Sequence, residues 1–174
     1  PNGGPKHTAL LTGKNAIVHK TIPQNELMGI VASTRLIVNF LEATDPGKHL
    51  EINILTDSQV CLDMLNENYI PKDSHTAHKL SEIIKNVSIM GSNVKFWHVN
   101  SENNVADIGT KGNCKLSDLK TEKYRHGPDW MIDLENNPTI VKLRHTFNGE
   151  PTKIIANLTK VIEDENNDGF YEQL

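Results

Sequence analysis

Apolar residues recur along the chain with the spacing expected of helices packed on a core. Between residues 21 and 43 the intervals are three, four and seven, which is typical of an amphipathic helix. The stripe consists of Leu27, Ile30, Val31, Val38 and Leu41. Thr21 and Pro23 suit the first turn of this helix. The turn-forming sequence Asp45-Pro46-Gly47 predicts that it ends near Ala43.

A second stripe predicts another helix, from about Ser74 to Met90, with four aliphatic residues facing inward: Leu80, Ile83, Ile84 and Val87. Shorter helices are predicted at 58–66, 105–111 and 152–163, and a helical turn at 116–119. Residues 163–168 are acidic, and we expect them to be mobile.

Other stretches have the composition of strands. Residues 50–56 form an apolar run that predicts a buried central strand, apolar on both faces. Residues 94–99 alternate and are rich in β-forming side chains. Two further short strands are predicted at 8–11 and 16–19. The order of strands and helices predicts an α/β protein, with a mixed sheet and helices packed on it.

Three carboxylates are placed where they can converge. Asp57 follows the strand at 50–56, Glu26 lies in the first turn of the preceding helix, and Asp107 opens the short helix after the strand at 94–99. If the two strands are parallel, Asp57 and Asp107 emerge at the same end of the sheet, where open α/β sheets carry their chemistry. Grouped carboxylates suit Mg²⁺, which binds through a few carboxylates, waters and substrate phosphates. Two such ions about 3.5–4 Å apart can assist a phosphodiester displacement.

Each acid also has a purely structural alternative. Asp57 is a good N-cap for the helix that follows it, and Asp107 can cap its own helix. Glu26 can simply favour a helix N-terminus, where its charge is worth about 0.3–1 kcal/mol. Only the three acids together point to a catalytic site.

Four neighbouring side chains are candidates for contacts with a nucleic acid. Thr56 and Ser58 flank Asp57 and can orient a substrate, although helix capping explains them equally well. Lys111 and Lys115 follow Asp107 and can touch phosphate oxygens. The alternative is that both are ordinary surface lysines.

Composition narrows the class of protein. With 174 residues the chain is one domain with an appendage. The net charge of −4 arises wholly within residues 131–174, which hold 4 Lys+Arg against 8 Asp+Glu, whereas residues 1–130 hold 14 of each. No basic footprint is evident, so we expect most phosphate contacts to come from a neighbouring domain. No run of about 20 apolar residues predicts a membrane span, and two isolated cysteines favour a reduced, intracellular setting.

Four segments in order resemble ribonuclease H domains of BEL/Pao-type retrotransposon polyproteins. Residues 21–27 (TIPQNEL) resemble that family's TIPRLEL, and residues 56–62 (TDSQVCL) resemble its TDSxxVL. Residues 97–112 (WHVNSENNVADIGTKG) resemble WxHVPSxxNPADxxTRG, and residues 126–131 (HGPDWM) resemble GPxWL. The resemblance covers residues 8–131. It implies a ribonuclease H-like fold, with a mixed sheet and helices on both faces, in residues 1–112.

The resemblance also implies an activity, namely hydrolysis of the RNA strand of RNA/DNA hybrids by two Mg²⁺ or Mn²⁺ ions. It leaves a 3′-hydroxyl and a 5′-phosphate. The family's metal site uses a first-strand Asp, a helix Glu, a strand-end Asp and a late Asp. The last three match Glu26, Asp57 and Asp107. Residues 113–174 would be an extension toward an integrase region, and reverse transcriptase and integrase regions of the same polyprotein would be partners. The setting would be a cytoplasmic particle or the nucleus.

The departures from the family pattern affect the expected activity. Nothing before Glu26 is acidic, so the first-strand Asp has no counterpart. The family's first strand, and most or all of the second, have no match, and there is no initiator Met, which suggests a fragment or a processed product. We therefore expect weak or no activity. Two alternatives stay open: an inactive structural or interaction module, and another nuclease of the same fold, such as a resolvase or exonuclease.

Overall fold

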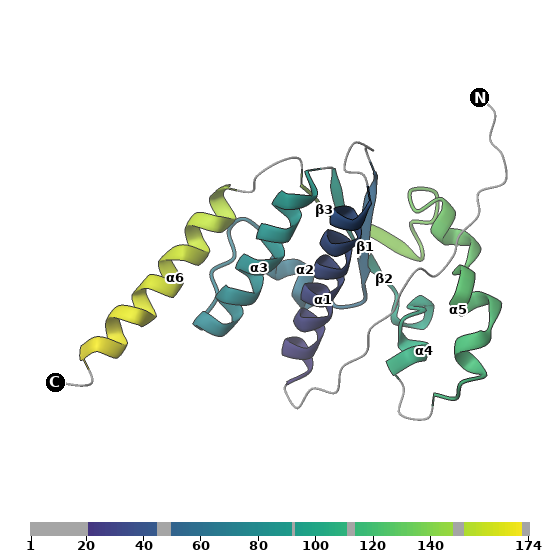
Figure 1. The fold of residues 1–174 in the computed structure, drawn as a ribbon, viewed down its shortest axis with the longest axis horizontal. Coiled ribbons are helices and arrows are strands. Elements are labelled where there is room, and N and C mark those ends of the chain that lie inside the picture. The colour runs from purple at the N-terminus through teal and green to yellow at the C-terminus, as the bar shows by residue number, and fades with distance from the viewer. Residues whose placement is uncertain (1–20, 45–49, 92, 111–113, 148–151, 172–174) are drawn as a thin grey trace. The chain divides into compact units, whose positions relative to one another are not determined.

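The computed structural model describes residues 21–44, 50–91, 93–110, 114–147 and 152–171 (Figure 1). In chain order the elements are α1 (Ile22–Ala43), β1 (Ile52–Thr56), α2 (Gln59–Met64), α3 (Ser74–Met90), β2 (Val94–Val99), η1 (Ser101–Asn103), α4 (Asp107–Thr110), η2 (Asp118–Lys120), α5 (Glu122–His126), η3 (Asp129–Ile132), β3 (Val141–Phe147) and α6 (Thr152–Tyr171). The three strands form one mixed sheet in the order β1-β2-β3. The protein is therefore α/β, as predicted. The strands expected at 8–11 and 16–19 lie outside the described residues.

The chain divides into two compact units. Of the described residues, those within 19–98 and 143–174 form the sheet unit, and those within 99–142 form the short-helix unit. The described residues of β3 from 143 onward and α6 belong to the sheet unit.

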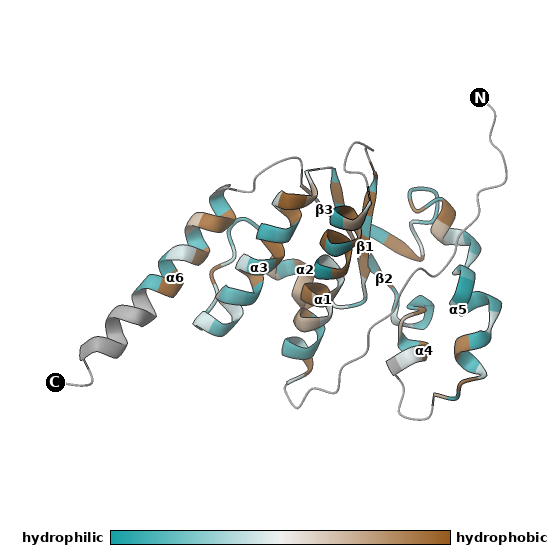
Figure 2. Ribbon diagram, viewed as in Figure 1, coloured by the Kyte–Doolittle hydropathy of each residue, from teal (hydrophilic) through white to brown (hydrophobic). Residues whose placement is uncertain are grey.

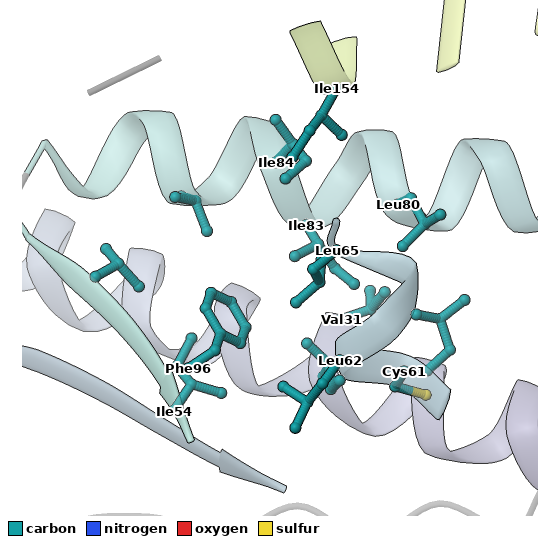
Figure 3. Close-up of a cluster of buried hydrophobic side chains, with 14 of the residues drawn as sticks. Val31, Ile54, Cys61, Leu62, Leu65, Leu80, Ile83, Ile84, Phe96 and Ile154 are labelled. Atoms are coloured by element: carbon teal, nitrogen blue, oxygen red, sulfur yellow. The ribbon is translucent and has the colours of Figure 1, made fainter. Parts of the chain in front are cut away.

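The core of the sheet unit is built by the predicted stripes. Leu27, Ile30, Val31 and Val38 of α1 are buried, and so are all four inward residues predicted for α3. Figure 2 shows apolar and polar positions alternating around both helices. The two helices pack against each other, and α6 packs against α3 (Figure 1). The core view in Figure 3 places Ile54 and Phe96 of the sheet beside residues of α2 and α3, with Ile154 of α6 nearby.

Local signals account for the ends of the helices. In α1 the backbone N–H of Thr21 donates to Gln24 Oε1 at 3.4 Å, and Pro23 occupies the first turn. Asp73 caps α3, since its Oδ1 accepts from the Thr76 N–H at 2.8 Å. Gly91 ends α3 at φ 59°, a left-handed conformation that glycine adopts without strain.

One strand differs from its prediction. β1 begins at Ile52, and Leu50 is 38% exposed outside it. Ile52 and Ile54 are buried while Asn53 and Leu55 are only half-buried, so the strand alternates instead of being apolar on both faces. The reason is that Asn53 accepts a 2.8 Å hydrogen bond from Trp97 Nε1 on that face. Of the described strands, β2 lies in the middle and β1 does not.

The C-terminal region contains more structure than predicted. Strand β3 was not predicted, although the alternation of Val141, Leu143, His145 and Phe147 with polar residues is typical of a strand. Phe147 packs edge-on against Phe96, with ring centroids 5.6 Å apart. Helix α6 continues through the acidic stretch 163–168, which was expected to be mobile. Of the helices in the described part of the chain, none combines the length and apolar character needed to cross a bilayer.

Candidate active site

The end of β1 and the start of α1 meet through one short hydrogen bond. Ser58 Oγ donates to Glu26 Oε2 at 2.6 Å, across 32 positions of the chain. Ser58 is buried and Glu26 is half-buried. The carboxylate of Glu26 is thereby held beside the residue that follows Asp57, so two of the three predicted acids belong to the same corner of the sheet unit.

Ser58, and not Asp57, is the N-cap of α2. Its Oγ accepts from the Cys61 N–H at 3.2 Å, while its own N–H donates to Thr56 Oγ1 at 3.2 Å. The capping alternative for Asp57 is therefore wrong, and the capping alternative for Ser58 is confirmed. Thr56 fixes the backbone at the same turn. These contacts position Asp57 at the bend where the strand becomes a helix.

The carboxylate of Asp57 has no structural use among the described residues. Its side chain is half-buried and makes no hydrogen bond or ion pair with another residue in the described part of the chain. A carboxylate in this state can accept an external ligand without giving up an internal contact.

The strand pairing agrees with the expected geometry. β1 and β2 are parallel, with Ile54 opposite Phe96 and Thr56 opposite His98. Both strands therefore end at the same edge of the sheet, the edge at which Asp57 and Glu26 lie. From the end of β2 the chain enters η1 and then α4.

Asp107 belongs to the short-helix unit, where neighbouring residues orient its side chain. It is half-buried as the first residue of α4. Asn104 Nδ2 donates to Asp107 Oδ1 at 3.2 Å, and Asn104 Oδ1 accepts from the Ala106 N–H at 3.2 Å. Asn104 thus orients this carboxylate, which also gains from the partial positive charge of a helix start.

The buried thiol near the site is chemically quiet. Cys61 Sγ lies 3.7 Å from the carbonyl oxygen of Pro23. Burial raises the pKa of the Cys61 thiol, and the charge of Glu26 raises that pKa further, against a lowering by the hydrogen bond with Ser58. Because the thiolate is the form that binds metals, Cys61 is unsuited to be a ligand.

Two carboxylates of the sheet unit, those of Glu26 and Asp57, are the candidate ligands for a divalent cation. Within each unit, the described residues contain no group of three or more His, Cys, Asp or Glu side chains arranged to hold a metal ion. Mg²⁺ in phosphoryl-transfer sites commonly uses one or two carboxylates and takes its other ligands from water and substrate phosphates. A cation bound at Glu26 and Asp57 would therefore need most of its ligands from water and substrate.

Of the two lysines predicted to contact a nucleic acid, only Lys115 lies within the described residues. Lys115 is exposed before η2, where its N–H donates to Asp118 Oδ2 at 2.9 Å. Lys111 lies outside the described residues. The contact between Ser58 and Glu26 was not predicted, because no sequence pattern relates two positions so far apart.

Comparisons with known proteins add no family: no family model, no curated protein and no solved structure matches this chain.

Proposed function

We propose that this chain is a ribonuclease H-type module of a retroelement polyprotein, which cleaves the RNA strand of RNA/DNA hybrids slowly and with Mg²⁺ or Mn²⁺. The observation that carries the proposal is the corner where Ser58 joins Glu26 to the turn that presents Asp57. It supports the sequence motifs because the helix Glu is hydrogen-bonded to the residue that follows the strand-end Asp, at the carboxyl edge of parallel strands.

Each residue has a defined part in this proposal. Asp57 and Glu26 would hold divalent cations. Asp107, which lies in the short-helix unit, matches the late Asp of the family's motif. Bound cations would supply charge neutralisation at the scissile phosphate and an activated water. Ser58 restrains the Glu26 carboxylate before any ligand arrives, which lowers the cost of organising the site. Thr56 keeps the turn in place.

The proposed activity is slow for a stated reason. Residues 1–25 contain no Asp or Glu, so these 174 residues offer three of the four carboxylates in the family pattern. Fewer carboxylates mean weaker attraction for a divalent cation. Reverse transcriptase and integrase regions would be the natural neighbours of such a module.

A specific observation also favours a non-enzymatic alternative. The chain of contacts from Glu26 through Ser58 to the Cys61 N–H is a complete helix cap. Such a network stabilises the start of α2 without any metal, so the same corner would be kept in an inactive interaction module.

Titration with Mn²⁺ followed by calorimetry separates these two functions. We expect weak binding to the unaltered protein and binding more than about tenfold weaker in Asp57→Asn. Glu51→Gln is the matched control, because Glu51 precedes β1 at the opposite end of the strand and pairs with Lys95 at 3.1 Å. Equal Mn²⁺ binding in the unaltered protein and in Asp57→Asn would favour the interaction module.

A cleavage assay then tests the reaction itself. We expect slow, metal-dependent loss of an end-labelled RNA strand in a hybrid, abolished in Asp57→Asn and retained in Glu51→Gln. Fast cleavage would contradict the expected impairment. Cleavage of branched or single-stranded DNA in preference to the hybrid would point instead to another nuclease of this fold.

A further inference from the structure

A run of exposed cations lies in the short-helix unit. Between residues 114 and 126 the chain carries four Lys or Arg and two Asp or Glu, a local charge of 4 − 2 = +2 in a protein whose net charge is −4. The cations are Lys115, Lys120, Lys123 and Arg125, and all four are exposed. We call them the cationic segment.

The acids within this segment are occupied elsewhere. Asp118 accepts from the Lys115 backbone N–H at 2.9 Å. Glu122 Oε2 lies 3.4 Å from His126 Nε2. Among the described residues, no carboxylate forms an ion pair with any of the four cations.

Several cations of the sheet unit, in contrast, form ion pairs with carboxylates. Arg35 pairs with Glu82, Lys95 with Glu51 at 3.1 Å, Arg144 with Asp63 at 3.2 Å and Lys153 with Glu67 at 3.5 Å. In those pairs a carboxylate of the protein neutralises the positive charge. The four cations of the cationic segment, in contrast, are available to bind an external anion.

Local hydrogen bonds hold the cations on a defined backbone. Thr121 ends η2 and caps α5, because its Oγ1 donates to the Asp118 carbonyl at 2.8 Å and accepts from the Tyr124 N–H at 3.4 Å. The two short helices also contact each other. Lys120 and Lys123 therefore flank a fixed turn and do not hang from a free loop.

We propose that the cationic segment binds the phosphate backbone of a nucleic acid. This inference rests on the proposed function and extends it to a substrate contact made by residues of the short-helix unit. Nucleic acids present closely spaced phosphates, one per about 3.4 Å of helix axis on each strand, which suits several cations on one short segment. An anionic membrane is the poorer fit, because membrane-surface helices need a broad apolar face, and α5 (EKYRH) has no aliphatic residue.

Fluorescence anisotropy with a labelled RNA/DNA hybrid in EDTA tests the proposal, since no metal-dependent step then contributes. The variant is Lys120→Gln/Lys123→Gln/Arg125→Gln. The charge-matched control is Lys72→Gln/Lys85→Gln/Lys160→Gln, whose three lysines are exposed in the sheet unit. Circular dichroism of both variants checks that each is folded.

We expect the first variant to bind about tenfold more weakly at about 0.1 M salt, and its log–log salt slope to fall by about two to three. The control should keep the slope of the unaltered protein. Equal losses in the two variants, an unchanged slope in the first, or capture by phosphatidylserine vesicles in place of the hybrid would overturn the inference. Loss of Mn²⁺ binding in Asp57→Asn reports separately on the proposed function, since the anisotropy assay contains no divalent metal.

Discussion

Replacing Ser58 by alanine removes both contacts that its hydroxyl makes. The N-cap bond to the Cys61 N–H contributes about 1 kcal/mol in comparable helices. The 2.6 Å bond to Glu26 has an ionised acceptor, and such bonds contribute about 1.5–3 kcal/mol. Because Glu26 is half-buried, water replaces part of the second loss. We therefore expect the free energy of unfolding of Ser58→Ala to fall by about 2–3 kcal/mol.

Urea denaturation followed by circular dichroism measures this change, and thermal unfolding should show a melting temperature lower by about 4–12 °C. Ser33→Ala is the control, because the Ser33 hydroxyl bonds the Gly29 carbonyl on the exposed side of α1. Its effect should stay within about 0.5 kcal/mol.

A double-mutant cycle with Glu26→Gln isolates the bond between the two side chains. We expect Ser58→Ala and Glu26→Gln to be non-additive by about 1 kcal/mol, since each removes the same contact. Strict additivity, or a loss below about 0.5 kcal/mol for Ser58→Ala, would refute the idea that this bond joins α1 to the end of β1.

Three further measurements test other parts of the structure. Leu158→Ala should lower the free energy of unfolding by about 2–5 kcal/mol in urea denaturation, because Leu158 of α6 is 1% exposed in the core. Asn86→Leu should cost about 1–3 kcal/mol, since buried Asn86 Nδ2 donates to Thr34 Oγ1 at 3.0 Å, and adding Thr34→Val should recover part of that loss. Burial raises the pKa of the Cys61 thiol above its ordinary value of 9.0 in the folded protein. The protonated thiol therefore contributes stability that is fully present below pH 9 and is lost as the pH rises through the pKa of the folded state. Between pH 8 and 11, the free energy of unfolding should decline less steeply for Cys61→Ala than for the unaltered protein.

The helices and strands of the sheet unit follow closely from local sequence. The predicted bounds of α3 and β2 agree with the structure, and α1 begins and ends where its capping and turn residues indicate. These predictions succeeded because apolar periodicity and capping depend on neighbours within a few residues. β3 was missed although its alternation was visible, because exposed Lys142, Arg144 and Thr146 gave the segment the composition of a polar linker.

The sequence likewise predicted only the local features of the candidate site. The sequence marked Glu26, Asp57 and Asp107 as acids at element ends, but it could not assign the cap of α2 to one of two adjacent residues. The structure gives that role to Ser58 and leaves Asp57 without a described partner. Ser58 Oγ also donates a hydrogen bond to Glu26 of α1, a long-range contact that no local rule contains.

By itself, the sequence determined where most helices and strands of the sheet unit lie, because local periodicity and turn chemistry decide these. Tertiary structure alone decided that Ser58 holds Glu26 beside the end of β1, that β1 and β2 run parallel, and that α6 joins the core. These features join segments distant along the chain, and they form only when buried apolar surface outweighs the entropy lost in bringing such segments together.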